Sequence, residues 1–222
     1  MKTKHTVEAQ VNQLNSIGYI TARIAPESLQ PIWDEVNHIS KSFRQAKPYN
    51  HSLAGNIEHE YELTECVDHT FELVEPFMEA MNEIFHHDKD YQLMDKACPY
   101  MMQSLWVNFQ KRYEFNPAHH HSGIYSFVIW LQVPYKIEDE IDRASSRNSR
   151  MRCPAHFQFS YTDSLGQISQ ELIPVDETYE GVLCIFPSKM IHQVYPFYTA
   201  EDYRISVSGN IGLKAGAFHA VD

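Results

Sequence analysis

Apolar residues in the first 100 positions recur mostly at helical spacing. Over residues 26–43 they follow one another every three or four positions, which predicts a helix with Pro26 in its first turn. A similar apolar stripe predicts a second helix over 68–85. In that helix Asp68 is the expected N-cap, and Pro76 marks either a kink or the true start. A short strand over 17–24 precedes the helices, and a loop over 46–60 separates them.

The spacing changes after residue 100 to the two-residue alternation of strands. Segments rich in Val, Ile, Phe, Tyr and Trp are separated there by turn residues. The predicted strands span 101–110, 124–133, 155–161, 170–174, 181–186, 193–197 and 203–211. Strands after two helices favour a mostly β protein of the α+β kind, a jelly roll or sandwich with the helices on one outer face. We expect one domain over 1–222, in which residues 1–98 support a β core over 99–213.

One connection between the predicted strands is long, polar and irregular. Residues 136–152 contain four arginines among serine and asparagine: Arg143, Arg147, Arg150 and Arg152. Two interpretations stay open. The segment is either a solvated loop or a lid that clamps an acidic or phosphorylated substrate.

Charge and composition narrow the class of protein. The net charge of −11, from 18 Lys and Arg against 29 Asp and Glu, disfavours nucleic-acid binding because it repels phosphate. No apolar run reaches the roughly 20 residues that span a bilayer, and the first residues lack the apolar core of a secretory signal. We therefore expect a cytoplasmic protein without membrane contact, whose cysteines are reduced and mostly buried. These cysteines are Cys66, Cys98, Cys153 and Cys184.

Thirteen histidines, nearly 6% of the chain, suggest metal ligands. Three of them are consecutive in the stretch NPAHHHSG, just before a predicted strand. Residues two apart in an extended chain share a face, so His119 and His121 can reach one ion while His120 points away. His192, from a distant strand, would complete a facial triad. Imidazole suits iron, zinc, copper or nickel. The alternative is a chance cluster of polar loop residues.

The last predicted strand carries an arginine on a polar face. Arg204, Ser206 and Ser208 alternate there with apolar residues. An arginine that points into a β core is costly unless it meets an anion, and its planar fork matches a carboxylate. Ser206 can add a hydroxyl donor. The alternative is a surface arginine on an edge strand.

Together these motifs resemble the Fe(II)/2-oxoglutarate-dependent oxygenase superfamily. The shared features are His-x-His near a strand start, FPS-x-x-x-H ending at His192, and R-I-S-x-S-x-N beginning at Arg204. The chain is most similar to a prolyl-4-hydroxylase-like branch found in marine bacteria and their viruses. Stretches shared with that branch are Leu53–Ile57 (LAGNI), Trp106–Lys111 (WVNFQK) and Glu114–Gly123 (EFNPAHHHSG). The resemblance covers roughly residues 50–212.

The resemblance implies a double-stranded β-helix of the jelly-roll, cupin-like type, with Fe(II) in its mouth and 2-oxoglutarate and O₂ as co-substrates. It assigns His119 and His192 as iron ligands. It also assigns Arg204, helped by Ser206, as the partner of the far carboxylate of 2-oxoglutarate. No catalytic residue beyond the metal ligands is expected. The host would be a bacterial or virus-infected cell.

The chain departs from the superfamily at the second ligand. Non-haem Fe(II) oxygenases usually bind iron through two histidines and one carboxylate, and this chain has His121 where an Asp or Glu is normal. We expect His119, His121 and His192 to form a three-histidine iron site. Two alternatives stay open. His121 could be the first ligand, with Gly123 leaving the carboxylate position vacant as in the halogenating members, or there could be no functional iron.

Further residues are candidates for binding 2-oxoglutarate. Asn108 and Gln110 share one face of the strand before the histidines, and Tyr125 and Tyr113 lie nearby in sequence. Ordinary strand packing is the alternative for each of them.

The expected activity is hydroxylation of a C–H bond in a peptide side chain, such as proline, or in a small molecule. The partner is an unidentified protein or small-molecule substrate, and a homodimer is possible on this fold. The alternatives are a three-histidine metal enzyme that needs no 2-oxoglutarate and a non-catalytic cupin-type binding domain. Since the fold hosts many functions, only the site decides between them.

Overall fold

The computed structural model describes residues 17–87 and 100–214. Its helices are α1 (Pro26–Lys41), α2 (Val67–Phe85) and α4 (Ile137–Ile141), with 3₁₀ turns η1 (Asn50–Ser52) and η2 (Glu177–Tyr179). The strands before residue 120 are β1 (Ile20–Arg23), β2 (His59–Glu62), β3 (Tyr100–Gln110) and β4 (Asn116–His119). The later strands are β5 (Tyr125–Gln132), β6 (Phe157–Thr162), β7 (Ile168–Ile173), β8 (Val182–Pro187), β9 (Ile191–Val194) and β10 (Arg204–Leu213).

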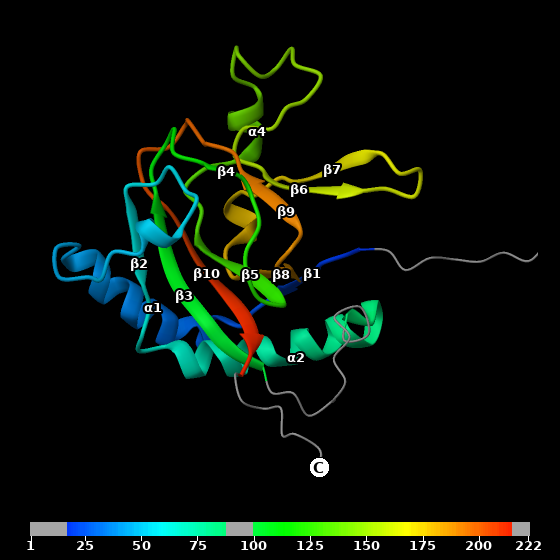
Figure 1. The fold of residues 1–222 in the computed structure, drawn as a ribbon. Coiled ribbons are helices and arrows are strands. Elements are labelled where there is room, and N and C mark those ends of the chain that lie inside the picture. Colours follow the sequence, from blue (N-terminus) through cyan, green and yellow to red (C-terminus); the bar gives the residue numbers. More distant parts are fainter. Residues whose placement is uncertain (1–16, 88–99, 215–222) are drawn as a thin grey trace, which may run out of the picture.

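The strands form two antiparallel sheets. The large sheet has the order β1-β8-β5-β10-β3-β2, and the small sheet has the order β4-β9-β6-β7. Helices α1 and α2 lie along the outer face of the large sheet, and the small sheet lies on its other side (Figure 1). This arrangement is the double-stranded β-helix that the sequence predicts, with the N-terminal helices on one outer face.

The large sheet separates two hydrophobic clusters. On β10, Ile205 and Val207 pack toward the helices, together with Val36 and Met78. The second cluster fills the space between the sheets, around Trp130, Phe157 and Phe186. Because side chains alternate along a strand, β5 and β8 give one face to each cluster, whereas the second faces of β3 and β10 line a pocket between the sheets. The polar residues predicted on β10 therefore lie between the sheets.

The predicted helices are confirmed to within two residues of their ends, and their apolar stripes are buried. Asp68 as the N-cap of the second helix is wrong, because α2 begins at Val67 and places Asp68 inside its first turn. Pro76 lies within α2 and does not start it. The buried carboxylate of Glu35 instead accepts hydrogen bonds at 2.7–3.0 Å from three successive backbone N–H groups, those of residues 64–66.

Three short elements were not predicted as helices or strands from the sequence. They are β2, β4 and α4. Strand β2 is rich in charge and β4 contains a proline, so neither has the apolar alternation that marks a strand. Cys66 and Cys184 are buried as expected, Cys153 is half-buried, and Cys98 lies outside the described residues.

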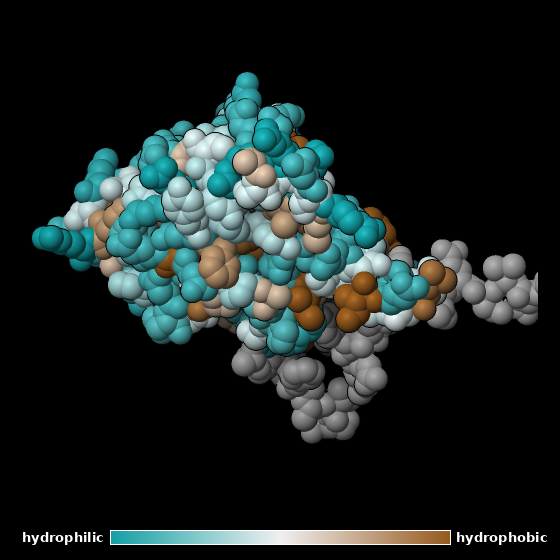
Figure 2. Space-filling model, turned by 90° about the horizontal axis from the view of Figure 1, so that it is seen from above, coloured by the Kyte–Doolittle hydropathy of each residue, from teal (hydrophilic) through white to brown (hydrophobic). Residues whose placement is uncertain are grey.

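The surface seen in Figure 2 is mostly hydrophilic, with hydrophobic residues in small separate groups. Within the described ranges, no helix has both the length and the apolar character needed to cross a bilayer.

Candidate functional site

Strands β4 and β9 bring two of the predicted metal ligands together. His119 is paired with His192 across this antiparallel ladder, and their ring centroids are 4.3 Å apart. The Nδ1 atom of His119 lies 2.7 Å from the carbonyl of Pro117, and that of His192 lies 3.0 Å from the carbonyl of Met190. A carbonyl can only accept, so each Nδ1 carries the hydrogen and each Nε2 keeps its lone pair.

His121 completes the group from the segment just after β4. Its backbone N–H donates to the carbonyl of Ser188 at 2.9 Å, which ties this segment to the end of β8. The ligand atoms of His119, His121 and His192 all lie within 4.8 Å of one another. His120, between them, is exposed. Among the described residues, no carboxylate joins this group.

The three imidazoles are uncharged at neutral pH. Burial lowers the pKa of His119, and it lowers that of His192 well below the ordinary value. Burial lowers the pKa of His121 to about 4, and repulsion from His119 and His120, when these rings are protonated, adds to the effect. The surroundings explain the desolvation, because Phe157 stacks on the His192 ring with centroids 5.6 Å apart. Neutral imidazoles present free lone pairs, which is the form that binds metal.

Gly123 does not belong to this group. Its φ of +96° and the 2.6 Å between an added Cβ and the carbonyl oxygen of Ile211 require glycine at this turn. It does not line the pocket, whereas His119 does. The geometry thus favours His119 over Gly123 as the partner of His121.

Arg204 lies in the same pocket and is only 2% exposed. Its Nε and Nη2 both donate to Oε1 of Gln110, at 3.2 and 2.5 Å. Its Nη1 donates to the hydroxyl of Tyr135 at 2.7 Å and to the carbonyl of Ala155 at 3.1 Å. All these acceptors are neutral, and within the described part of the chain no carboxylate lies within 4.0 Å of the guanidinium. A buried cation without an anion is a place for an anionic ligand.

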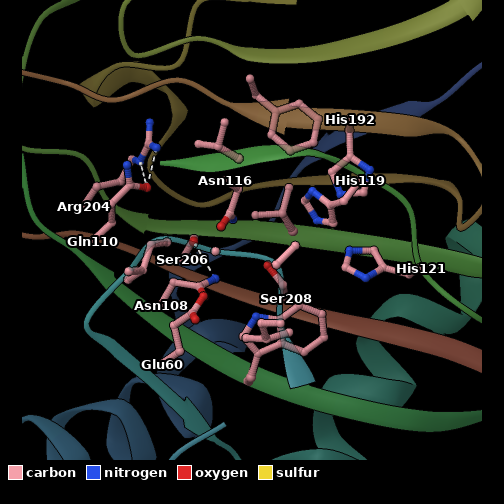
Figure 3. Close-up of a pocket in the computed structure, with 18 of the residues that line it drawn as sticks. Glu60, Asn108, Gln110, Asn116, His119, His121, His192, Arg204, Ser206 and Ser208 are labelled. Carbon is pink, nitrogen blue, oxygen red and sulfur yellow. Dashed lines mark hydrogen bonds between the residues drawn. The ribbon is translucent and has the colours of Figure 1, made fainter. Parts of the chain in front are cut away.

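Polar side chains connect the arginine to the histidines. Ser206 is paired with Asn108 across β10 and β3, and the Asn108 amide Nδ2 donates to the Ser206 hydroxyl at 3.3 Å. Figure 3 shows Arg204 and Gln110 on one side of the pocket and the three histidines on the other. Asn108 and Ser206 thus lie where a dicarboxylate could reach both groups. Gln110 orients Arg204, and its own Nε2 donates to the carbonyl of Glu114 at 2.6 Å.

Two of the predicted 2-oxoglutarate-binding residues lie elsewhere. Tyr125 is wrong because β5 turns it toward the helices, where its hydroxyl donates to Oδ1 of Asn82 at 2.6 Å. Tyr113 is also wrong, since it is 57% exposed and does not line the pocket.

The arginine-rich segment does not reach the pocket either. None of its residues lines the pocket, and its arginines beyond Arg143 are exposed. Arg143 lies over the ring of Tyr198, with its guanidinium carbon 3.7 Å from the ring centroid. The geometry therefore favours the solvated loop over the lid.

Sequence reasoning missed two pocket residues, Glu60 and Asn116. Glu60 is 1% exposed, and it points into the pocket from β2, opposite Asn108 in the sheet register (Figure 3). Asn116 reaches the pocket from β4. Both belong to segments without a clear strand pattern, so nothing in the sequence indicated which way they point.

The residues present fit a metal ion and an anionic co-substrate. Three neutral imidazoles form a donor set suited to a first-row metal. The side-chain oxygens Oδ1 of Asn108 and Asn116 are buried and have no hydrogen-bond partner among the described residues. Buried polar atoms are rarely left in this state, and both atoms belong to residues that line this pocket.

Comparisons with known proteins agree with this geometry. Residues 104–210 match a family model described as "Putative 2OG-Fe(II) oxygenase". No curated protein matches the sequence. Among solved structures, a prolyl-4-hydroxylase from Pseudomonas putida has a TM-score of 0.52 and 13% identity, covering 90% of this chain and 95% of that chain.

Two further structures share the fold. A prolyl hydroxylase from Trichoplax adhaerens, in complex with a hypoxia inducible factor peptide fragment, has a TM-score of 0.51 and 11% identity, covering 89% of this chain and 84% of that one. The non-heme alpha ketoglutarate dependent epimerase SnoN from nogalamycin biosynthesis has a TM-score of 0.51 and 12% identity. The match covers 88% of this chain and 77% of SnoN. At such identities the likeness establishes the fold alone. Together, the family match over residues 104–210 and the shared fold of the prolyl-4-hydroxylase-like structures indicate a 2-oxoglutarate- and Fe(II)-dependent oxygenase.

Proposed function

We propose that this oxygenase hydroxylates a C–H bond of a peptide side chain or of a small molecule, using a three-histidine iron site. His119, His121 and His192 hold the Fe(II). One observation carries the proposal: a single pocket contains three neutral imidazoles that converge and a buried arginine that has no anionic partner.

The iron site differs in charge from the usual one. Three neutral ligands leave both positive charges of Fe(II) uncompensated by the protein. The two carbonyls that accept from His119 and His192 fix the ring orientations, as outer partners of metal-binding histidines generally do. When bound, Fe(II) together with 2-oxoglutarate and O₂ supplies the oxidising chemistry of this enzyme class.

Arg204 binds the far carboxylate of 2-oxoglutarate in this proposal. Its guanidinium is held by Gln110 and Tyr135, so it is already oriented before the ligand arrives. Ser206 and Asn108 lie beside it and contribute hydroxyl and amide groups to the same carboxylates. Gln110 and Tyr135 are positioning residues, because they act through Arg204.

The two substrate classes follow from structures that share the fold. The Trichoplax enzyme was solved with a peptide fragment, and SnoN belongs to the biosynthesis of a small molecule. The family match disfavours a non-catalytic binding domain and an enzyme that needs no 2-oxoglutarate.

The test is thermal stabilisation and uncoupled CO₂ release with Fe(II) and 2-oxoglutarate, added alone and together. We expect 2-oxoglutarate to stabilise the protein only when metal is present. Arg204→Ala should abolish this effect. Since that variant loses several buried hydrogen bonds, the milder Ser206→Ala should weaken 2-oxoglutarate binding in a protein that still folds.

Arg147→Ala is the control, because it removes a positive charge from an exposed position. It should behave as the wild type. Absence of any metal-dependent stabilisation in the wild type would contradict the proposed function. Metal binding without a 2-oxoglutarate effect would favour the enzyme that needs no 2-oxoglutarate.

A further inference from the structure

The pocket contains a carboxylate that the proposed iron and 2-oxoglutarate sites do not use. Glu60 is 1% exposed and lines the pocket from β2, at the edge of the large sheet. Its carboxylate accepts one long hydrogen bond within the described structure, from Asn50 Nδ2 to Oε2 at 3.3 Å. Within the described ranges, no Lys, Arg or His nitrogen lies within 4.0 Å of its carboxylate.

A buried carboxyl group without a cation is unfavourable for the folded protein. Burial and the nearby charge of Glu114 raise the pKa of Glu60 to about 7. The long hydrogen bond from Asn50 offsets this rise only in part. Perturbed acidic groups in a cleft often mark the place where a ligand binds.

A second acceptor lies next to Glu60. An added Cβ on Gly55 would be 2.3 Å from Oδ1 of Asn116 and 2.7 Å from Oε1 of Glu60. The two oxygens therefore lie within about 5 Å of each other, next to Gly55. One nitrogen between them could donate to both, because N–H···O bonds span roughly 2.7–3.2 Å.

The Asn116 oxygen is buried, and no group in the described part of the chain donates to it. Within the described structure, the site thus combines a carboxylate that has no cationic partner with an amide oxygen that has no hydrogen-bond donor. Both oxygens accept, so the missing group must donate. The net charge of −11 adds a long-range attraction for cations.

We infer that the prime substrate carries a cationic nitrogen, a primary amine or a guanidinium, which binds between Glu60 and Asn116. This inference rests on the proposed function and names the substrate class of the same pocket. Glu60 and Asn116 are then residues that determine specificity. Arg204 recognises the anionic co-substrate, while Glu60 recognises the cationic substrate.

The experiment uses the full chain with Zn(II), a redox-inactive substitute for Fe(II), and 2-oxoglutarate. The probes are n-butylammonium and n-propylguanidinium, with n-butanol as the neutral control, and chemical-shift titration gives the Kd. We expect at least one cation to bind at least tenfold more tightly than butanol. Glu60→Gln should remove that preference.

Glu62→Gln is the matched control. Glu62 lies two residues further along the same strand and pairs with Lys47 outside the pocket. Glu62→Gln removes one negative charge, as Glu60→Gln does, but leaves the pocket unchanged. It should keep the wild-type Kd within twofold. Gly55→Ala places a methyl group between the two oxygens and should weaken cation binding even with both acceptors present.

The inference is overturned if neither cation binds more tightly than butanol, or if Glu60→Gln binds the preferred cation as the wild type does. The same samples report Zn(II) and 2-oxoglutarate binding independently. If the protein binds a cation but neither Zn(II) nor 2-oxoglutarate, the proposed function is contradicted and the Glu60 site is still supported. The reverse result would reject the Glu60 site alone.

Discussion

His119 and His192 face each other across β4 and β9 with ring centroids 4.3 Å apart. The two residues are 73 positions apart in the chain, and the backbone ladder fixes their separation. Each ring is also held by a carbonyl two residues before it. A site fixed by regular strands and local hydrogen bonds needs little rearrangement to receive a metal ion.

His192→Ala should weaken metal binding by more than 100-fold. Loss of an outer partner of a metal ligand typically costs about 10–100-fold, and loss of a ligand should exceed this. Calorimetric titration with Mn(II) measures the change. His120→Ala is the control, since it removes an exposed histidine from the same stretch and should leave the affinity unchanged. Equal affinities in wild type and His192→Ala would reject the three-histidine site.

His121→Asp should retain metal binding, whereas His121→Ala should lose at least tenfold in affinity. Aspartate restores the common set of two histidines and one carboxylate, and it removes one unit of net positive charge from the metal site. Metal content after dialysis distinguishes the two variants. If His121→Ala binds metal as well as the wild type, His121 is not a ligand.

Gln110→Glu should weaken 2-oxoglutarate binding at least tenfold. The new carboxylate would accept the same two hydrogen bonds from Arg204 as an internal ion pair, and it would compete with the co-substrate. Titration of 2-oxoglutarate with Mn(II) present gives the affinity. Gln45→Glu adds the same charge at an exposed position and should have no effect. Unchanged affinity in Gln110→Glu would argue against Arg204 as the carboxylate partner.

The free energy of unfolding should fall as the pH rises through the range set by Glu60. Its pKa is about 7 in the folded protein, above the ordinary 4.5, because of burial and the charge of Glu114. The folded state therefore binds more protons than the unfolded state between these values, and stability is lost as pH rises from about 4.5 through 7. The pKa difference corresponds to a change on the order of 3 kcal/mol.

Glu60→Gln should flatten this dependence, so its unfolding temperature should exceed that of the wild type more at pH 8 than at pH 5. Thermal unfolding of ligand-free protein at both values makes the comparison. Glu62→Gln should follow the wild type. A difference between Glu60→Gln and wild type that is the same at both pH values would show that Glu60 does not titrate with a raised pKa.

Glu35→Ala should lower the free energy of unfolding by at least about 2 kcal/mol. Three buried or half-buried N–H groups at the start of α2 would lose their acceptor. Urea unfolding measures the loss. Asp34→Asn, at the neighbouring exposed position, should change stability by less than about 0.5 kcal/mol.

The sequence allowed the prediction of those parts of the site that lie on regular, alternating strands. Arg204, Ser206 and Asn108 follow from a two-residue period that assigns each side chain to a face. His119 and His121 follow from the same rule applied to the histidine stretch. The prediction that Tyr125 binds 2-oxoglutarate failed, because the alternation along β5 does not say which of its two faces meets the helices. Only the place of the strand in the sheet decides this.

Glu60 could not be predicted, because its position depends on tertiary structure. Strand β2 is four residues long, rich in charge, and formed by pairing with β3. The hydrogen bonds from the turn before α2 to Glu35 could not be predicted for a similar reason, since the acceptor comes from 29–31 residues earlier in the chain. Secondary-structure propensity depends on residues that are neighbours in sequence, whereas the contacts of Glu60 and Glu35 join distant segments.

The alternation along β10 has a consequence for how this gene can change. A substitution at one position alters one contact, but a single inserted or deleted residue within the strand would exchange its two faces. Arg204 would then turn toward the helices, and Ile205 would turn into the pocket. Length variation should therefore be tolerated in connections such as residues 142–152 and excluded from β3, β5 and β10. A deletion scan across these segments would reveal the strands of the site without any knowledge of the substrate.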